Sequence, residues 1–104
     1  MKLKSKVAII TGGSRGQGAA EAKLFAEEGA SVIIGDILDD EGKKVANEIE
    51  DQGGSAVYVR LDVQNEADWN NAVNLAIKTY GKLDILVNNA AILTLSTIEE
   101  TTKE

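Results

Sequence analysis

The chain contains no cysteine, no histidine and no proline among its 104 residues. Without cysteine it has no disulfide framework and no thiol nucleophile, and without histidine it has no Ser-His-Asp triad. A zinc site built from the usual nitrogen and sulfur ligands is excluded for the same reason, so any metal would need oxygen ligands. These absences remove several common catalytic mechanisms.

Basic residues and long hydrophobic runs are also scarce. The chain has 11 Lys and Arg against 17 Asp and Glu, which gives a net charge of −6. Because binding to nucleic acid relies on clustered positive charge, we expect no nucleic-acid partner. No apolar run approaches the roughly 18 residues of a membrane helix, and residues 7–10 are too few for a signal-peptide core. We therefore expect a cytoplasmic protein with no membrane partner.

Four short β-branched runs, at residues 6–11, 30–35, 55–60 and 84–88, alternate with three helical patterns. Three of the runs are almost continuously apolar, as in parallel strands buried on both faces, whereas the third alternates and suits a sheet edge. Strand–helix alternation implies right-handed βαβ units. We predict an α/β fold whose parallel sheet has strand order 3-2-1-4 and helices on both faces. Residues 1–104 would form one half-domain that ends after the fourth strand.

The helical patterns each have an apolar face and an end signal. The first, residues 16–28, has a face of small residues and Phe25, and the second, residues 39–52, has Val45 and Ile49 four positions apart. The third starts after Asn65, a typical N-cap, and stops at Gly81. Its apolar residues recur with a period of about 3.6, so we expect them to pack on the sheet. They are Trp69, Val73, Ala76, Ile77 and Tyr80.

A glycine-rich segment, residues 11–18 (TGGSRGQG), lies between the first predicted strand and the first predicted helix. Glycine lets the backbone turn sharply and approach a pyrophosphate, and the positive helix end favours phosphate. The spacing of Gly12, Gly16 and Gly18 differs from the G-x-G-x-x-G fingerprint and from the lysine-containing P-loop. We interpret the segment as a dinucleotide site. The alternative is a tight turn that only lets the helix pack on the sheet.

Asp36 ends the second predicted strand, where an acidic side chain can accept hydrogen bonds from the adenosine ribose. The alternative is a local cap of the strand end. A carboxylate would repel the 2′-phosphate of NADP. It would accept a hydrogen bond from the free 2′-hydroxyl of NAD, which stabilises the complex by about 1.5–3 kcal/mol. Arg15 opposes this preference because it could reach a 2′-phosphate, but residue 37 is Ile rather than a basic residue. We therefore predict NAD as the cofactor, preferred over NADP.

Four segments together resemble the short-chain dehydrogenase/reductases: the glycine loop, Asp36, residues 62–63 after the third strand and residues 88–91 after the fourth. The resemblance implies a Rossmann-type fold and, for the complete protein, NAD(P)-dependent interconversion of an alcohol and a carbonyl. It also implies a homo-oligomer. The family's NNAG segment appears here as NNAA, with Ala91 in place of the usual glycine.

The resemblance assigns roles to individual residues. Asp62 would contact the adenine amino group and Val63 would line the adenine pocket, although Asp62 could instead cap the strand end or a helix. Asn88 would brace the sheet. The predicted cofactor-binding residues are Gly12, Ser14, Arg15, Gly16, Gln17, Gly18, Asp36, Ile37, Asp62, Val63, Asn89, Ala90 and Ala91.

The family's catalytic residues have no counterpart in the chain. Its acid/base tyrosine stands four residues before a lysine, whereas Tyr58 and Tyr80 have Asp62 and Asp84 at that distance. We predict no catalytic residue and no metal ligand within the chain, and no turnover by the chain alone. Two other hypotheses remain open. The chain could be a stand-alone dinucleotide-binding module or subunit, or a fragment that folds poorly and associates through its apolar end.

Overall fold

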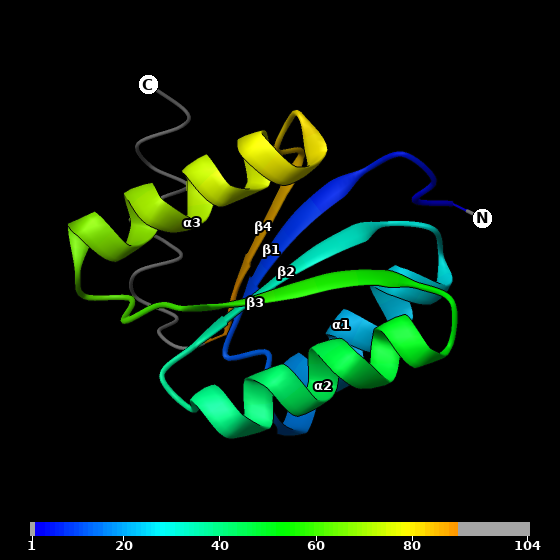
Figure 1. Ribbon diagram of the computed structural model, residues 1–104, viewed down its shortest axis with the longest axis horizontal. Coiled ribbons are helices and arrows are strands. Elements are labelled where there is room, and N and C mark those ends of the chain that lie inside the picture. Colours follow the sequence, from blue (N-terminus) through cyan, green and yellow to red (C-terminus); the bar gives the residue numbers. More distant parts are fainter. Residues whose placement is uncertain (1, 90–104) are drawn as a thin grey trace.

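The computed structural model describes residues 2–89. Figure 1 shows a twisted parallel sheet with helices on both faces, as predicted. The sheet order is β3-β2-β1-β4, which confirms the predicted 3-2-1-4 arrangement. The elements in chain order are β1 (Val7–Thr11), α1 (Gly16–Glu27), β2 (Ser31–Asp36), α2 (Asp39–Asp51), β3 (Ser55–Arg60), α3 (Glu66–Tyr80) and β4 (Ile85–Asn88). Ala90 and Ala91 lie outside the described residues.

β1 lies in the interior of the sheet and pairs in parallel with β2 on one side and β4 on the other. Ile10, for example, is aligned with Ile34 of β2 and with Val87 of β4. The chain moves outward through β2 and β3 with α1 and α2 on one face, and α3 then crosses the other face to β4 (Figure 1). This reversal of direction creates a crevice beyond the carboxyl ends of β1 and β4, the usual ligand position in such sheets.

The side chains of β1 alternate between two hydrophobic clusters. Ile10 belongs to the cluster beneath α1 and α2, whereas Val7 and Ile9 belong to the cluster beneath α3. All five residues of β1 are buried because both faces of the sheet are covered, which explains the continuous apolar run in the sequence. The predicted face of α1 is confirmed, with Ala22 fully buried and Phe25 packed against the same cluster.

Three of the five residues predicted to face the sheet from α3, the two aromatic ones and Ala76, lie in the cluster beneath the helix, whereas Val73 and Ile77 do not. Ala72 and Ala76 are fully buried, whereas Val73 is 36% exposed and Ile77 is 49% exposed. The small alanine side chains let the helix approach the sheet closely. Each following residue is rotated by about 100° around the helix axis, which turns Val73 and Ile77 outward.

Other predicted features of the elements are confirmed. Asn65 caps α3, with its side-chain oxygen accepting a hydrogen bond from the Asp68 N–H at 3.2 Å, and Gly81 ends the helix with a φ of 86°. β3 lies at a sheet edge.

Within residues 2–89, no helix is long and apolar enough to cross a membrane.

Asp84 ties the start of β4 to the start of β1. Its carboxylate accepts a hydrogen bond from the Val7 N–H at 2.9 Å, and its own N–H donates to the Val7 carbonyl at 2.9 Å. Lys82 forms an ion pair with the same carboxylate at 3.4 Å. The bond from Val7, followed by the contact with Lys82, holds the pKa of Asp84 below its ordinary value.

This contact predicts a pH dependence of stability. A carboxylate with a lowered folded pKa stabilises the fold above its unfolded pKa of about 3.9, and this contribution is lost as the pH falls through the folded pKa. Asp84→Asn should therefore lower the free energy of unfolding near neutral pH and flatten its decline in acid. Urea denaturation at a series of pH values measures both effects. Asp51→Asn, which changes an exposed carboxylate at the end of α2, is the control. An acid profile identical to that of the parent chain would show that Asp84 does not contribute.

Candidate functional site

The segment after β1 turns back on itself before it enters α1. Gly12 and Gly16 have φ values of 65° and 60°, in the left-handed region that favours glycine. At Gly18, an added Cβ would lie 1.9 Å from the carbonyl oxygen of Gly12. The first turn of α1 therefore rests directly on the loop backbone. This contact supports the interpretation that Gly18 lets the helix pack closely on the loop.

A cavity of about 410 Å³ lies beside the glycine loop, within the range of small-molecule sites. The Arg15 side chain does not cap the first turn of α1. N–H groups in the first turn of a helix lack intrahelical partners and, with the positive helix end, suit an anionic group. The structure brings together predicted residues from three separate segments here. The lining residues are Gly12, Arg15, Gln17, Gly18, Asp36, Ile37, Leu38 and Asn89.

The carboxylate of Asp36 joins the end of β2 to the glycine loop. Its Oδ2 accepts hydrogen bonds from the Ser14 hydroxyl at 2.5 Å and the Ser14 N–H at 3.3 Å. Its Oδ1 accepts from the N–H groups of Ile37 at 2.7 Å and Leu38 at 3.4 Å. Asp36 thus closes the turn locally and also lines the cavity, so both sequence interpretations have geometric support. A ribose hydroxyl reaching Oδ2 would have to share that atom with buried Ser14 or displace its hydroxyl.

A smaller cavity of about 150 Å³ adjoins the first and shares Gly12, Asp36 and Ile37 with it. Its other lining residues are Leu61, Asp62 and Val63. Asp62 accepts a hydrogen bond from the Gln64 N–H at 3.0 Å, which closes the turn after β3. This side chain, like Asp36, therefore has a local structural contact and a place beside a cavity.

Thr11 links the carboxyl ends of β1 and β4. Its hydroxyl donates to the Asn88 side-chain oxygen at 2.8 Å and accepts from the Asn89 N–H at 3.1 Å. The Asn89 side-chain amide donates to the Thr11 carbonyl at 3.1 Å and to Glu21 of α1 at 2.7 Å. Buried Asn88 therefore braces the sheet, and Asn89 is held at the edge of the larger cavity.

Three polar side chains that the sequence analysis did not predict surround the turn after β2. The Tyr58 hydroxyl lies 2.7 Å from the Asp36 carbonyl oxygen and 2.5 Å from Asp39 Oδ1. Arg60 Nη1 donates to the Ile37 carbonyl at 3.0 Å and to Asp39 Oδ2 at 3.2 Å. Positions 58 and 60 are two residues apart and therefore share one face of β3, next to β2. This spacing is the only sequence signal for the cluster.

The ionisation of two of these side chains is shifted by their contacts. The hydrogen bond from Tyr58, and then the positive charge of Arg60, lower the pKa of Asp39 despite some desolvation. Burial, followed by the contact with Asp39, raises the pKa of Tyr58 above its ordinary value. Near neutral pH, Tyr58 is therefore a protonated donor and Asp39 is an ionised acceptor.

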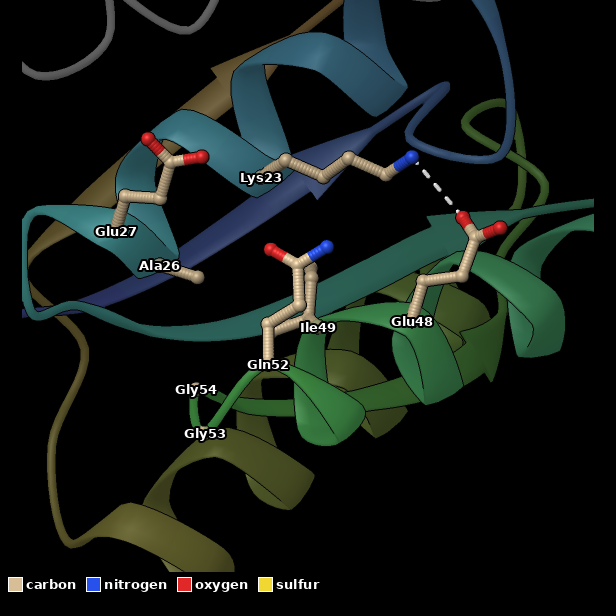
Figure 2. A pocket seen from close by; sticks show the side chains of 8 residues that line it. All are labelled: Lys23, Ala26, Glu27, Glu48, Ile49, Gln52, Gly53 and Gly54. Carbon is tan, nitrogen blue, oxygen red and sulfur yellow. Dashed lines mark ion pairs between the residues drawn. The ribbon is translucent and has the colours of Figure 1, made fainter.

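A separate cavity of about 260 Å³ lies between the later turns of α1 and α2 (Figure 2). Lys23 and Glu48 form an ion pair beside it at 3.0 Å, with 44% and 40% of their side-chain surfaces exposed. The cavity also borders Gly54, immediately before β3 begins. Ligands of open α/β sheets bind beyond the carboxyl ends of the strands, so this position does not suit the principal site. Within residues 2–89, no cluster of acidic side chains could hold a metal ion.

Comparison with known proteins identifies the family. Residues 6–104 match the family described as short chain dehydrogenase. The chain is 50% identical over 99 residues to a 2,5-dichloro-2,5-cyclohexadiene-1,4-diol dehydrogenase of Sphingobium indicum, covering 95% of this chain and 40% of the relative. It is also 50% identical over 99 residues to a 3-alpha-(or 20-beta)-hydroxysteroid dehydrogenase of Mycobacterium tuberculosis, covering 95% of this chain and 37% of the relative. The chain therefore belongs to the short-chain dehydrogenase family.

A solved structure supports the same conclusion. The hydroxysteroid dehydrogenase from Escherichia coli superposes with a TM-score of 0.83 and 43% sequence identity, over 86% of this chain and 38% of that one. The chain thus spans about 40% of the length of the curated relatives that it matches.

The close contact at Gly18 predicts a selective sensitivity to substitution. Gly18→Ala would force the loop and α1 apart, so we expect the free energy of unfolding to fall by about 1–3 kcal/mol. Urea denaturation followed by circular dichroism measures this change. Gln17→Ala, at an exposed position in the same helical turn, should stay within about 0.5 kcal/mol of the parent chain. Equal stability of the two variants would contradict the packing of Gly18 against Gly12.

Proposed function

We propose that this chain is the cofactor-binding half of an NAD-dependent oxidoreductase that interconverts an alcohol and a carbonyl. The observation that carries the proposal is the cavity between the glycine loop, the carboxylate of Asp36 and the side chain of Asn89. It lies at the carboxyl edge of the sheet, where family and fold both favour a dinucleotide. The bound nicotinamide would accept or donate the hydride, and the chain's own residues would bind and orient it.

The two adjoining cavities suggest how the dinucleotide is divided among the residues. The glycine loop, with Gly12, Gly16, Gly18 and flanking residues Ser14, Arg15 and Gln17, would hold the pyrophosphate. Asp36 would accept hydrogen bonds from the adenosine ribose, and the adenine would enter the smaller cavity. There it would meet Ile37, Asp62 and Val63. Asn89 would border the ribose on the nicotinamide side. Ala90 and Ala91, which lie outside the described residues, are proposed to bind the cofactor from the family resemblance alone.

The charges around the ribose position support NAD over NADP. The carboxylate of Asp36 lines the larger cavity and would repel a 2′-phosphate. Arg15 also lines that cavity and is the one predicted residue that favours NADP. Ile37, which follows Asp36, is 52% exposed and offers no positive charge to a phosphate. We therefore propose that Asp36, rather than Arg15, determines the cofactor preference.

The proposed reaction class follows the names of the relatives, which include a diol dehydrogenase, a hydroxysteroid dehydrogenase and the cyclopentanol dehydrogenase of Comamonas testosteroni. The last is 41% identical over 103 residues, covering 99% of this chain and 41% of the relative. Each name denotes oxidation of a hydroxyl-bearing compound. For the complete protein we propose an alcohol or ketone substrate, a homo-oligomeric assembly and a cytoplasmic location.

Replacement of Asp36 tests the proposed cofactor preference. Asp36→Ala should weaken NADH binding about tenfold or more, because a charge-assisted hydrogen bond is lost, and should narrow the preference over NADPH. Calorimetric titration with each cofactor, after a circular dichroism check of folding, measures both changes. Asp40→Ala removes an exposed carboxylate nearby and is the matched control. Unchanged affinity of Asp36→Ala for both cofactors would remove Asp36 from the site.

A further inference from the structure

The side chains of Tyr58, Asp39 and Arg60 form a unit that we call the β3 clamp. Tyr58 and Arg60 contact two successive carbonyl oxygens of the turn after β2, those of Asp36 and Ile37. The two carboxylate oxygens of Asp39 each accept from one of these side chains. Asp39 thus bridges both contacts, and removing its charge would loosen the two together.

The clamp holds residues that border both cavities. Asp36 and Ile37 line the larger cavity beside the glycine loop and the smaller one beside Asp62. The register of the sheet aligns Arg60 with Asp36, and the Arg60 guanidinium reaches the carbonyl of Ile37, a residue that borders both cavities. The side chain of Arg60 is 63% exposed, and its contacts with this region are the bonds to the Ile37 carbonyl and the Asp39 carboxylate.

Packing under α2 fixes the other half of the clamp. A Cβ added at Gly42 would lie 2.2 Å from the Tyr58 ring, so the helix backbone rests directly on the aromatic side chain. Tyr58 has little freedom to follow a displaced turn. Arg60, whose side chain is exposed, is the member that can change partners.

We propose that Asp39 is a specificity-determining positioning residue, which holds the turn through Tyr58 and keeps the Arg60 guanidinium bonded away from a 2′-phosphate. This inference rests on the proposed function, since it concerns recognition of the adenosine ribose of NAD. Its physical basis is competition for one cation. A phosphate and the Asp39 carboxylate are both anionic acceptors that arginine can bond, and only Asp39 is built into the fold.

The test compares cofactor affinities of Asp39→Asn and the control Asp40→Asn by calorimetric titration of the full chain. We expect Asp39→Asn to weaken NADH binding about threefold to tenfold and to strengthen NADPH binding, lowering the NADH-to-NADPH affinity ratio about tenfold or more. Asp40→Asn should leave the ratio unchanged. A merely structural role for Asp39 would lower both affinities equally, and that result, or an unchanged ratio, would overturn the inference.

Two further variants separate the components of the clamp. Arg60→Met, at the exposed member, should weaken NADH binding without any gain for NADPH, and in the double variant Asp39→Asn/Arg60→Met the gain for NADPH should disappear. If Asp39→Asn does not fold, Arg60→Met decides alone, and NADH affinity equal to that of the parent chain would overturn the positioning role. Failure of the folded parent chain to bind NADH would instead overturn the proposed function, and this inference with it.

Discussion

The parallel pairing of β1 with both β2 and β4 is the constraint on which the rest of the structure depends. Parallel strands place all their carboxyl ends at one edge, so the segments after them converge even though they are far apart in the chain. Gly12, Asp36, Asp62 and Asn89 each follow or end a different strand and meet at this edge. Because the chain reverses direction at β1, the helices separate to opposite faces and leave the edge open.

Much of this arrangement could be predicted from the sequence because its physical causes are local. Strands buried on both faces must be apolar throughout, so the β-branched runs marked all four strands within about one residue at each end. The glycines of the loop are required by backbone conformation and close contact, which are also local demands. The predicted face of α3 was wrong at Val73 and Ile77, because a helical period does not specify the rotation of the helix against the sheet. Close approach of Ala72 and Ala76 to the sheet decides that.

The β3 clamp could not be predicted because it depends on register between neighbouring strands. Nothing in a run of residues states that Arg60 aligns with Asp36, or that Tyr58 reaches the turn beyond the next strand. Asp36 shows a related difficulty. A carboxylate that closes a turn and one that lines a cavity have the same sequence pattern, and here one side chain does both. Local bonding therefore does not argue against a role in recognition.

The contact between Gly42 and Tyr58 has a consequence for how this region can diversify. With helix backbone against an aromatic ring, the separation of α2 from β3 is set by the thickness of that ring. Insertions or a larger residue at Gly42 would shift the whole helix and the turn that precedes it. Sequence changes that preserve the fold here would therefore replace side chains and leave the backbone of α2 and the preceding turn in place. A new ligand preference at the turn after β2 would then arise by point substitution rather than by a change in loop length.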